Sequence, residues 1–237
     1  MAENIVELLT DVADAIREKK GTQDKINAQS FANEIKNLPS GGGDNLNAYK
    51  DTTGNGISNI ESISFSEGVT TIQSYAYHYC KGLKELIIPE GVQDVDAYAF
   101  ANCPNIKTIS LPSSIKHLGQ QCFAKISELE SITIPKDAPL TFLPRNLLWQ
   151  STKLQKFIVP KNVTQMAAFV FEGCTGLIYI DFSNLNAIPS LENINAFSGV
   201  NAKIVVPDAI YEDWIKATNW SSLADKIIMN SQYTRPL

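Results

Sequence analysis

Residues 83–128 decide the fold, because they consist of two adjacent segments that follow one pattern. Residues 83–105 read LKELIIPEGVQDVDAYAFANCPN, and residues 106–128 read IKTISLPSSIKHLGQQCFAKISE. Each segment has 23 residues, and apolar side chains occupy the same first, fourth, sixth, tenth and thirteenth positions. Self-similarity at a fixed period of this length is the signature of a repeat architecture, in which successive copies stack on one another.

The pattern continues on both sides of these two segments. Copies begin at Ile60, Leu83, Ile106, Leu129 and Leu154, and a more divergent copy follows from Leu177. The copy from Leu129 has 25 residues, two more than the others, and a strand-like IVVP occupies residues 204–207. A single copy is too small to bury its own apolar side chains, so we expect the copies to share one continuous core.

The consensus L-x-x-I-x-I-P-x-x-V-x-x-I-x-x-x-A-F-x-x-C-x-x begins with a leucine-rich-repeat signature. Alternation at the fourth and sixth positions indicates a short strand with one face inward, which the following proline ends because it cannot donate to a strand ladder. We therefore predict a leucine-rich-repeat solenoid over residues 46–207, with short parallel strands on one face and irregular return legs. Phe100, Phe123 and Phe171 fill one recurring core position.

Both ends of such an array need caps. Residues 208–237 are predicted to form a helical C-terminal cap, in which Ile210, Trp214 and Ile215 start the apolar cover. Residues 46–59 contain Asn55-Gly56, a strong turn signal, and are expected to form a hairpin or an irregular first rung.

The first 39 residues follow a different pattern. Ile5, Leu9, Val12 and Ile16 recur at helical spacing within residues 4–20, and a second helix is expected from Asn27 to Leu38, before Pro39. Residues 40–45 include three consecutive glycines and are predicted to be a flexible linker. Such a helical pair is too small to form a stable core of its own. Self-association through residues 4–38, docking on the same chain, and binding to another protein all remain open.

Residues 60–207 resemble the BspA-like leucine-rich repeats. The L-x-x-I-x-I-P blocks and the A-F-x-x-C blocks carry this resemblance, above all Ala99, Phe100 and Cys103. Proteins of this type are typically surface proteins of host-associated bacteria and some protozoa, used in adhesion or protein binding. The resemblance therefore implies a binding role.

Residues 4–39 resemble a short module at the start of phage and prophage tail or minor structural proteins. The segments LLTDVADAIREKKGT and INAQSFANEI carry this second resemblance. It implies a virion or prophage appendage that displays the solenoid. The chain opens with an acidic, amphipathic stretch in place of a secretory signal and has no apolar run of bilayer length. The predicted location is therefore a phage-like appendage or the bacterial cell surface.

Composition narrows the classes of partner. A net charge of -5 and a pI of about 5.1 argue against nucleic acid and against an anionic membrane surface as partners. We expect a protein or glycan partner on a cell surface, and no membrane insertion.

Nothing in the sequence forms a catalytic, cofactor or metal constellation. Cys80, Cys103 and Cys174 recur at one position of their copies, which favours a small buried thiol over a disulfide or a metal ligand. The two histidines, His78 and His117, lie in different copies and lack a partner ligand pair. The carboxylates are scattered along the repeats, and no glycine-rich phosphate motif follows a strand. We therefore predict a protein that is not an enzyme and binds no cofactor.

The best candidate surface is the outward side of the predicted strands, at the third and fifth positions of each copy. These residues are Ser62, Ser64, Glu85, Ile87, Thr108, Ser110, Ser131, Thr133, Lys156, Ile158, Tyr179 and Asp181. An aromatic row, Tyr75, Tyr98 and Phe169, is a second candidate, since exposed aromatic side chains anchor partners or stack on sugars. Each set also has an ordinary interpretation: a solvated sheet face for the first, and packing against the return leg for the second.

Two functions follow as hypotheses. The first is a non-enzymatic binding or structural protein that presents its repeat surface to a protein or glycan, as part of a phage-like tail or a cell-surface assembly. The alternative is a secreted bacterial adhesin whose export signal is absent from this chain.

Overall fold

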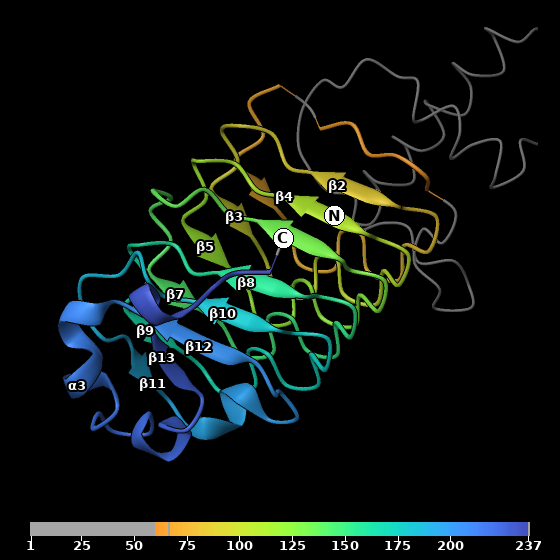
Figure 1. Ribbon diagram of the computed structural model, residues 1–237. Helices are drawn as coiled ribbons and strands as arrows, with labels where there is room; N and C mark the ends of the chain where they lie inside the picture. The colour runs from red at the N-terminus through yellow and green to blue at the C-terminus, as the bar shows by residue number, and fades with distance from the viewer. Residues whose placement is uncertain (1–59, 66, 237) are drawn as a thin grey trace, which may run out of the picture. The chain divides into compact units, whose positions relative to one another are not determined.

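The computed structural model of the chain describes residues 60–65 and 67–236. The predicted helical module of residues 1–39, the linker of residues 40–45 and the first rung of residues 46–59 lie outside the described residues. In the described part, the predicted leucine-rich-repeat solenoid is confirmed, with one turn of chain for each copy (Figure 1).

The first side of the solenoid carries the strands that the L-x-x-I-x-I pattern predicts. They are β2 (Glu85–Ile87), β4 (Thr108–Ser110), β6 (Ser131–Thr133), β8 (Lys156–Ile158), β10 (Tyr179–Asp181) and β12 (Lys203–Val206). All pairings between them are parallel and in register, so that Leu86 pairs with Ile109 and Ile109 with Ile132. Equivalent positions of successive copies therefore lie side by side. We call the outward side of these strands the strand face.

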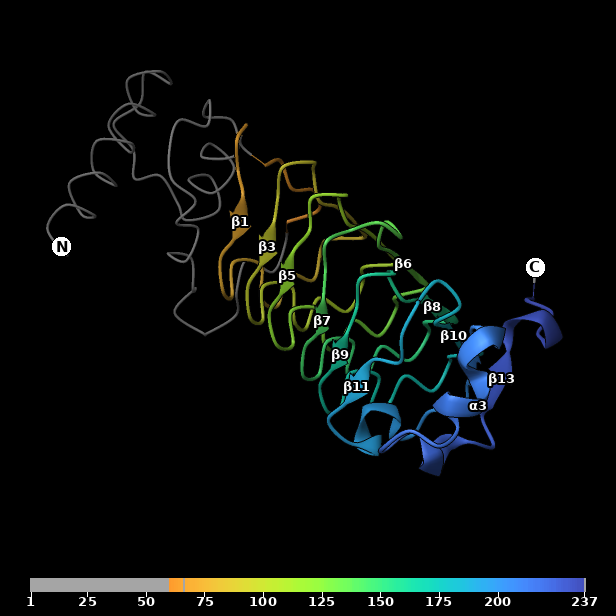
Figure 2. The ribbon, with the colours of Figure 1, turned by 90° about the vertical axis from the view of Figure 1, so that its left-hand side faces the viewer.

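The return legs are more regular than predicted. Each contains a two-residue strand, and these are β1 (Thr71–Ile72), β3 (Asp94–Val95), β5 (His117–Leu118), β7 (Phe142–Leu143), β9 (Gln165–Met166) and β11 (Ser190–Leu191). Figure 2 shows them in a row on a second side of the solenoid. The second residue of each pair is apolar and buried, from Ile72 to Leu191. Alternation over only two residues is too short a signal to be recognised as a strand in the sequence.

The third side turns through left-handed backbone, although most of the residues there are not glycine. One row has φ between 56° and 64° and comprises Tyr75, Tyr98, Gln121, Asn146 and Phe169. A second row, four residues further on, comprises Tyr79, Asn102, Lys125, Gln150 and Gly173. Here alternate N–H groups reach the next rung: that of Tyr98 donates to the carbonyl of Gln120 at 3.0 Å, and that of Phe100 to Cys122 at 2.9 Å. These hydrogen bonds offset the cost of the left-handed geometry, about 1–2 kcal/mol for a residue with a Cβ.

The interior is a continuous apolar column, as the repeat predicts. Phe100, Phe123 and Phe171 are fully buried, and the rings of Phe100 and Phe123 stack with centroids 5.9 Å apart. The four cysteines are buried and free.

The ladders are interrupted within the copy that carries two extra residues. Strand β6 pairs with β4 and not with β8, whereas β7 pairs with β9 and not with β5. The first strand of this copy therefore belongs to the earlier sheets and its second strand to the later ones. Elsewhere the residue after the return-leg strand donates to the previous rung, as Gly119 N does to Val95 O at 2.7 Å. Pro144 occupies that place beside β5 and has no N–H to donate.

The C-terminal cap is only partly helical. It contains η3 (Asp208–Ile210), α3 (Tyr211–Trp214), η4 (Ser221–Leu223) and η5 (Asn230–Gln232). Between the last two, β13 (Ile227–Met229) pairs with β12, so the parallel sheet continues into the segment that was predicted as helical cover. Trp214 and Trp220 are fully buried and close the end of the apolar column.

Candidate functional site

The strand face is open to solvent along β2, β4, β6 and β8. Glu85, Ile87, Ser110, Thr133, Lys156 and Ile158 are exposed there, and Thr108 and Ser131 are half-buried. These eight residues are called the open strand face below. Ile87 and Ile158 stand out among the small or charged side chains, because 61% and 43% of their surfaces are exposed.

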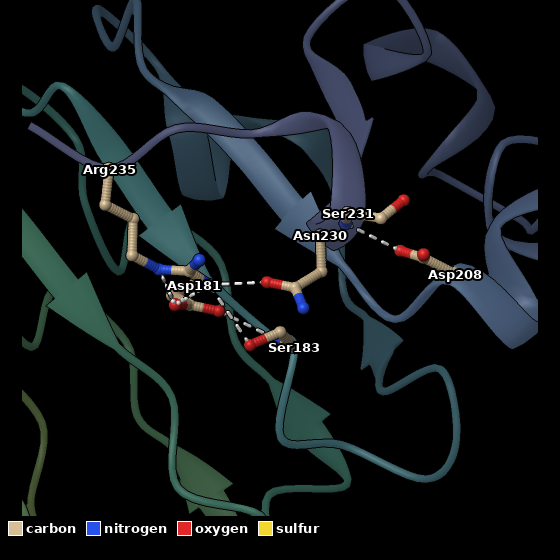
Figure 3. A network of polar contacts seen from close by, with 6 residues as sticks. All are labelled: Asp181, Ser183, Asp208, Asn230, Ser231 and Arg235. Atoms are coloured by element: carbon tan, nitrogen blue, oxygen red, sulfur yellow. Dashed lines mark hydrogen bonds and ion pairs between the residues drawn. The ribbon is translucent and has the colours of Figure 1, made fainter.

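The strand face is covered at its C-terminal end, which corrects the sequence analysis. Tyr179 and Asp181 lie on the outward side of β10 as expected, but each is only 4% exposed. Residues 230–236, which we call the C-terminal segment, cross back over β10. Arg235 contacts Asp181 (Figure 3), and the ring of Tyr233 lies 5.4 Å from that of Tyr179. The prediction of an accessible surface at Tyr179 and Asp181 was therefore wrong.

A polar network holds the C-terminal segment in place (Figure 3). Arg235 donates from Nε and Nη2 to Oδ2 of Asp181, at 2.9 and 2.6 Å. Its Nη2 also approaches Ser183 Oγ at 3.3 Å and Asn230 Oδ1 at 2.7 Å. Where the segment begins, the N–H of Ser231 donates to Oδ1 of Asp208 at 3.0 Å. The hydrogen bonds from the hydroxyl and the N–H of Ser231 lower the pKa of the Asp208 carboxyl.

The aromatic row is brought together only in part. The rings of Tyr75 and Tyr98 stack at 4.8 Å and are nearly parallel, with Tyr75 half exposed. Phe169 lies three rungs away from Tyr98, and the guanidinium of Arg145 lies 5.2 Å from the centre of its ring. His78 and Tyr79, which the repeat pattern does not mark as candidates, extend this cluster, and their rings lie 4.1 Å apart beside Tyr75.

The described residues offer little for metal or covalent chemistry. Within residues 60–65 and 67–236, no group of three or more histidine, cysteine or acidic side chains is arranged to hold a metal ion. The same part of the chain was also compared with what a membrane span requires: none of its helices is long and apolar enough to cross a bilayer. Within the described residues, three ion pairs join adjacent rungs: Lys107 with Glu130 at 3.7 Å, Lys153 with Glu128 at 2.6 Å, and Lys161 with Asp137 at 2.5 Å.

The thiols of the four cysteines are expected to be unreactive in the folded protein. Burial raises the pKa of the Cys174 thiol to about 12 and also raises the pKa of Cys80, Cys103 and Cys122. The thiolate is the reactive form, so neither access nor ionisation favours reaction near neutral pH. Titration with a chromogenic disulfide at pH 8 should detect no thiol in the native chain, and all 4 after unfolding in guanidinium. Rapid modification of one native thiol would show that its rung opens.

The repeats of this chain match one known family. The family model "BspA type Leucine rich repeat region (6 copies)" matches residues 55–178 and 141–207, which together make up more than half of the chain. The chain belongs to the BspA type leucine-rich-repeat family. The match begins after the N-terminal module, so it does not bear on the resemblance of residues 4–39 to phage proteins.

Solved structures show the same fold as this BspA type protein. A leucine-rich repeat protein from Bacteroides ovatus is 25% identical, with a TM-score of 0.57, and the match covers 64% of this chain and 38% of that one. The pneumococcal vaccine antigen PcpA is 19% identical, with a TM-score of 0.53, over 72% of this chain and 47% of that one. The chain thus spans less than half the length of these relatives. Among curated proteins, none matches the chain.

Proposed function

We propose that this BspA type protein is a non-enzymatic binding protein whose open strand face contacts a protein or glycan on a cell surface. The observation that supports this most is the pair Ile87 and Ile158, exposed on a face of otherwise small or charged side chains. Apolar side chains of this kind gain most from being covered by a partner. The face extends over four rungs, which suits a broad and shallow interface with a macromolecule.

Matched variants test the proposal. Full-length chain is screened against a glycan array and a panel of purified cell-surface and matrix proteins. Ile87→Asp is expected to weaken the resulting interaction at least tenfold, because a carboxylate would have to be desolvated at the interface. Phe142→Asp is the control, since Phe142 is a similarly exposed apolar residue, 42%, on β7 of the second side. If binding persists in Ile87→Asp and is lost in Phe142→Asp, the partner binds the second side of the solenoid and not the open strand face.

If the partner is a glycan, we expect the aromatic row to take part in binding. The half-exposed ring of Tyr75 is backed by Tyr98, a rigid arrangement of the kind that stacks on a sugar ring. If the array identifies a glycan, Tyr75→Ala should weaken its binding more than Ile87→Asp does.

We further propose that the N-terminal module attaches the solenoid to a larger assembly, of a phage-like tail or of a bacterial surface. This rests on the resemblance of residues 4–39 to phage tail proteins, with a secreted adhesin as the alternative. If the module self-associates, Leu9→Asp and Ile16→Asp should reduce the full-length chain to a monomer in light scattering, because each places a charge in the predicted apolar stripe. Glu18→Gln, outside that stripe, should leave the mass unchanged. An oligomer that persists in both aspartate variants would contradict self-association through this stripe.

A further inference from the structure

We propose that the strand face carries a binding site for the arginine side chain of an extended peptide, and that the chain's own C-terminal segment fills this site. The site lies at Asp181 on the outward side of β10, beyond the open strand face. It is therefore separate from the surface of the proposed function, and the two can be tested independently.

The acceptor groups are held by the solenoid before any arginine arrives. Oδ1 of Asp181 accepts a hydrogen bond from the N–H of Ser183 at 2.9 Å, which fixes the carboxylate and leaves Oδ2 for the guanidinium. The Oγ of Ser183 supplies a second acceptor beside it. Arg235 engages Oδ2 through two nitrogens, the planar geometry in which arginine differs from lysine.

The spacing of the C-terminal segment matches the spacing of the strand. Tyr233 has extended backbone, with φ -101° and ψ 115°, so its side chain and that of Arg235 point to the same side. Tyr179 and Asp181 are likewise two residues apart on one side of β10. The ring of Tyr233 lies 5.4 Å from that of Tyr179, while Arg235 contacts Asp181. The site therefore fits a peptide with an aromatic residue two positions before an arginine.

The C-terminal segment is held as a ligand would be. None of its residues belongs to the buried core, and the side chain of Arg235 is 36% exposed while that of Asp181 is 6% exposed. Its contacts with the solenoid include those of the Tyr233 ring and the Arg235 guanidinium, and the Ser231–Asp208 hydrogen bond. A partner segment that carries the same two side chains can replace the contacts of Tyr233 and Arg235.

The test supplies the segment in trans. The full-length Arg235→Ala variant, labelled with ¹⁵N, is titrated with the peptide acetyl-SQYTRPL, and the amide signals of Asp181 and Ser183 are followed. Saturable shifts are expected, with binding at least tenfold tighter than to the wild-type chain, whose site is already occupied. Arg235→Lys, which keeps the charge without the planar fork, should bind the peptide more weakly than Arg235→Ala does.

Two controls make the result specific. The same peptide with alanine in place of arginine should cause no shift, and the double variant Arg235→Ala, Asp181→Asn should bind the original peptide at least tenfold more weakly. The single variant Arg235→Ala and the double variant both change side chains outside the apolar column. Each is therefore expected to give the spectrum of a folded chain before the titration. The proposal is overturned if Arg235→Ala shows no saturable shift, if the wild-type chain binds equally well, or if Asp181→Asn makes no difference.

Discussion

Replacing Gly119 by alanine is expected to lower the free energy of unfolding by about 3 kcal/mol, near the upper end for overpacking a core. A Cβ at this position would lie 2.2 Å from the backbone nitrogen of Ala97 and 2.5 Å from the carbonyl carbon of Asp96. These atoms belong to the backbone of the preceding rung, so no side-chain rotation relieves the clash. The two rungs would have to separate, at the expense of the hydrogen bond from Gly119 N to Val95 O.

Gly68→Ala is the matched control. Gly68 has φ +78°, but nothing lies within 4 Å of a Cβ added there. Its substitution should cost only the left-handed conformation, about 1 kcal/mol, whereas Gly119 lies outside that region of φ. Urea denaturation followed by circular dichroism compares the two. If both variants unfold at the same urea concentration, close contact between rungs is not what requires glycine at position 119.

Replacing Trp220 by alanine should lower the free energy of unfolding by about 3–5 kcal/mol, the usual cost of truncating a large buried aromatic side chain. Trp220 is 1% exposed, and its ring contacts those of Phe182, Phe197 and Trp214 at 5.3–5.6 Å. Its Nε1 also donates to the carbonyl of Pro189 at 2.9 Å. The variant would leave a cavity at the end of the apolar column and an unpaired carbonyl beside it.

Trp149→Ala is the control for Trp220→Ala. It shows whether the loss of stability comes from the position of Trp220 in the cap or from removing any tryptophan. Trp149 is half-buried on a corner, where the ammonium of Lys125 lies 4.7 Å from its ring. Its truncation should cost about 1 kcal/mol, as for a partly exposed cation–π pair. Thermal unfolding followed by circular dichroism gives both values. An equal loss of stability in the two variants would mean that the cap does not close the column as the packing indicates.

The repeat made most of the fold predictable. Leu86, Ile109 and Phe157 occupy one position of the consensus, and each is buried on a strand of the first side. The second row of strands was not predicted, because each has only two residues. The break beside Pro144 was not predicted either, although a missing backbone donor is visible in the sequence once the ladder position is known.

The candidate surface was predictable up to the point where another segment covers it. Alternation placed Ile87 and Ile158 on the outward side, and they are exposed there. The same alternation applies to Tyr179 and Asp181, which are buried because Tyr233 and Arg235 lie over them. The C-terminal segment follows no period, so no pattern relates it to a strand more than fifty residues earlier.

By itself, the sequence determined that the chain forms a solenoid and which side chains enter its core, because a fixed period makes each copy's apolar positions coincide with those of the next. Only the tertiary structure decided where the sheets break, which glycine must remain small and which part of the strand face is open. The sheets break within the copy that has two extra residues, Gly119 must stay small because the backbone of the preceding rung lies against it, and the strand face is covered where the C-terminal segment folds back. The energies of such contacts arise from distances across the assembled solenoid, which local sequence preferences do not encode.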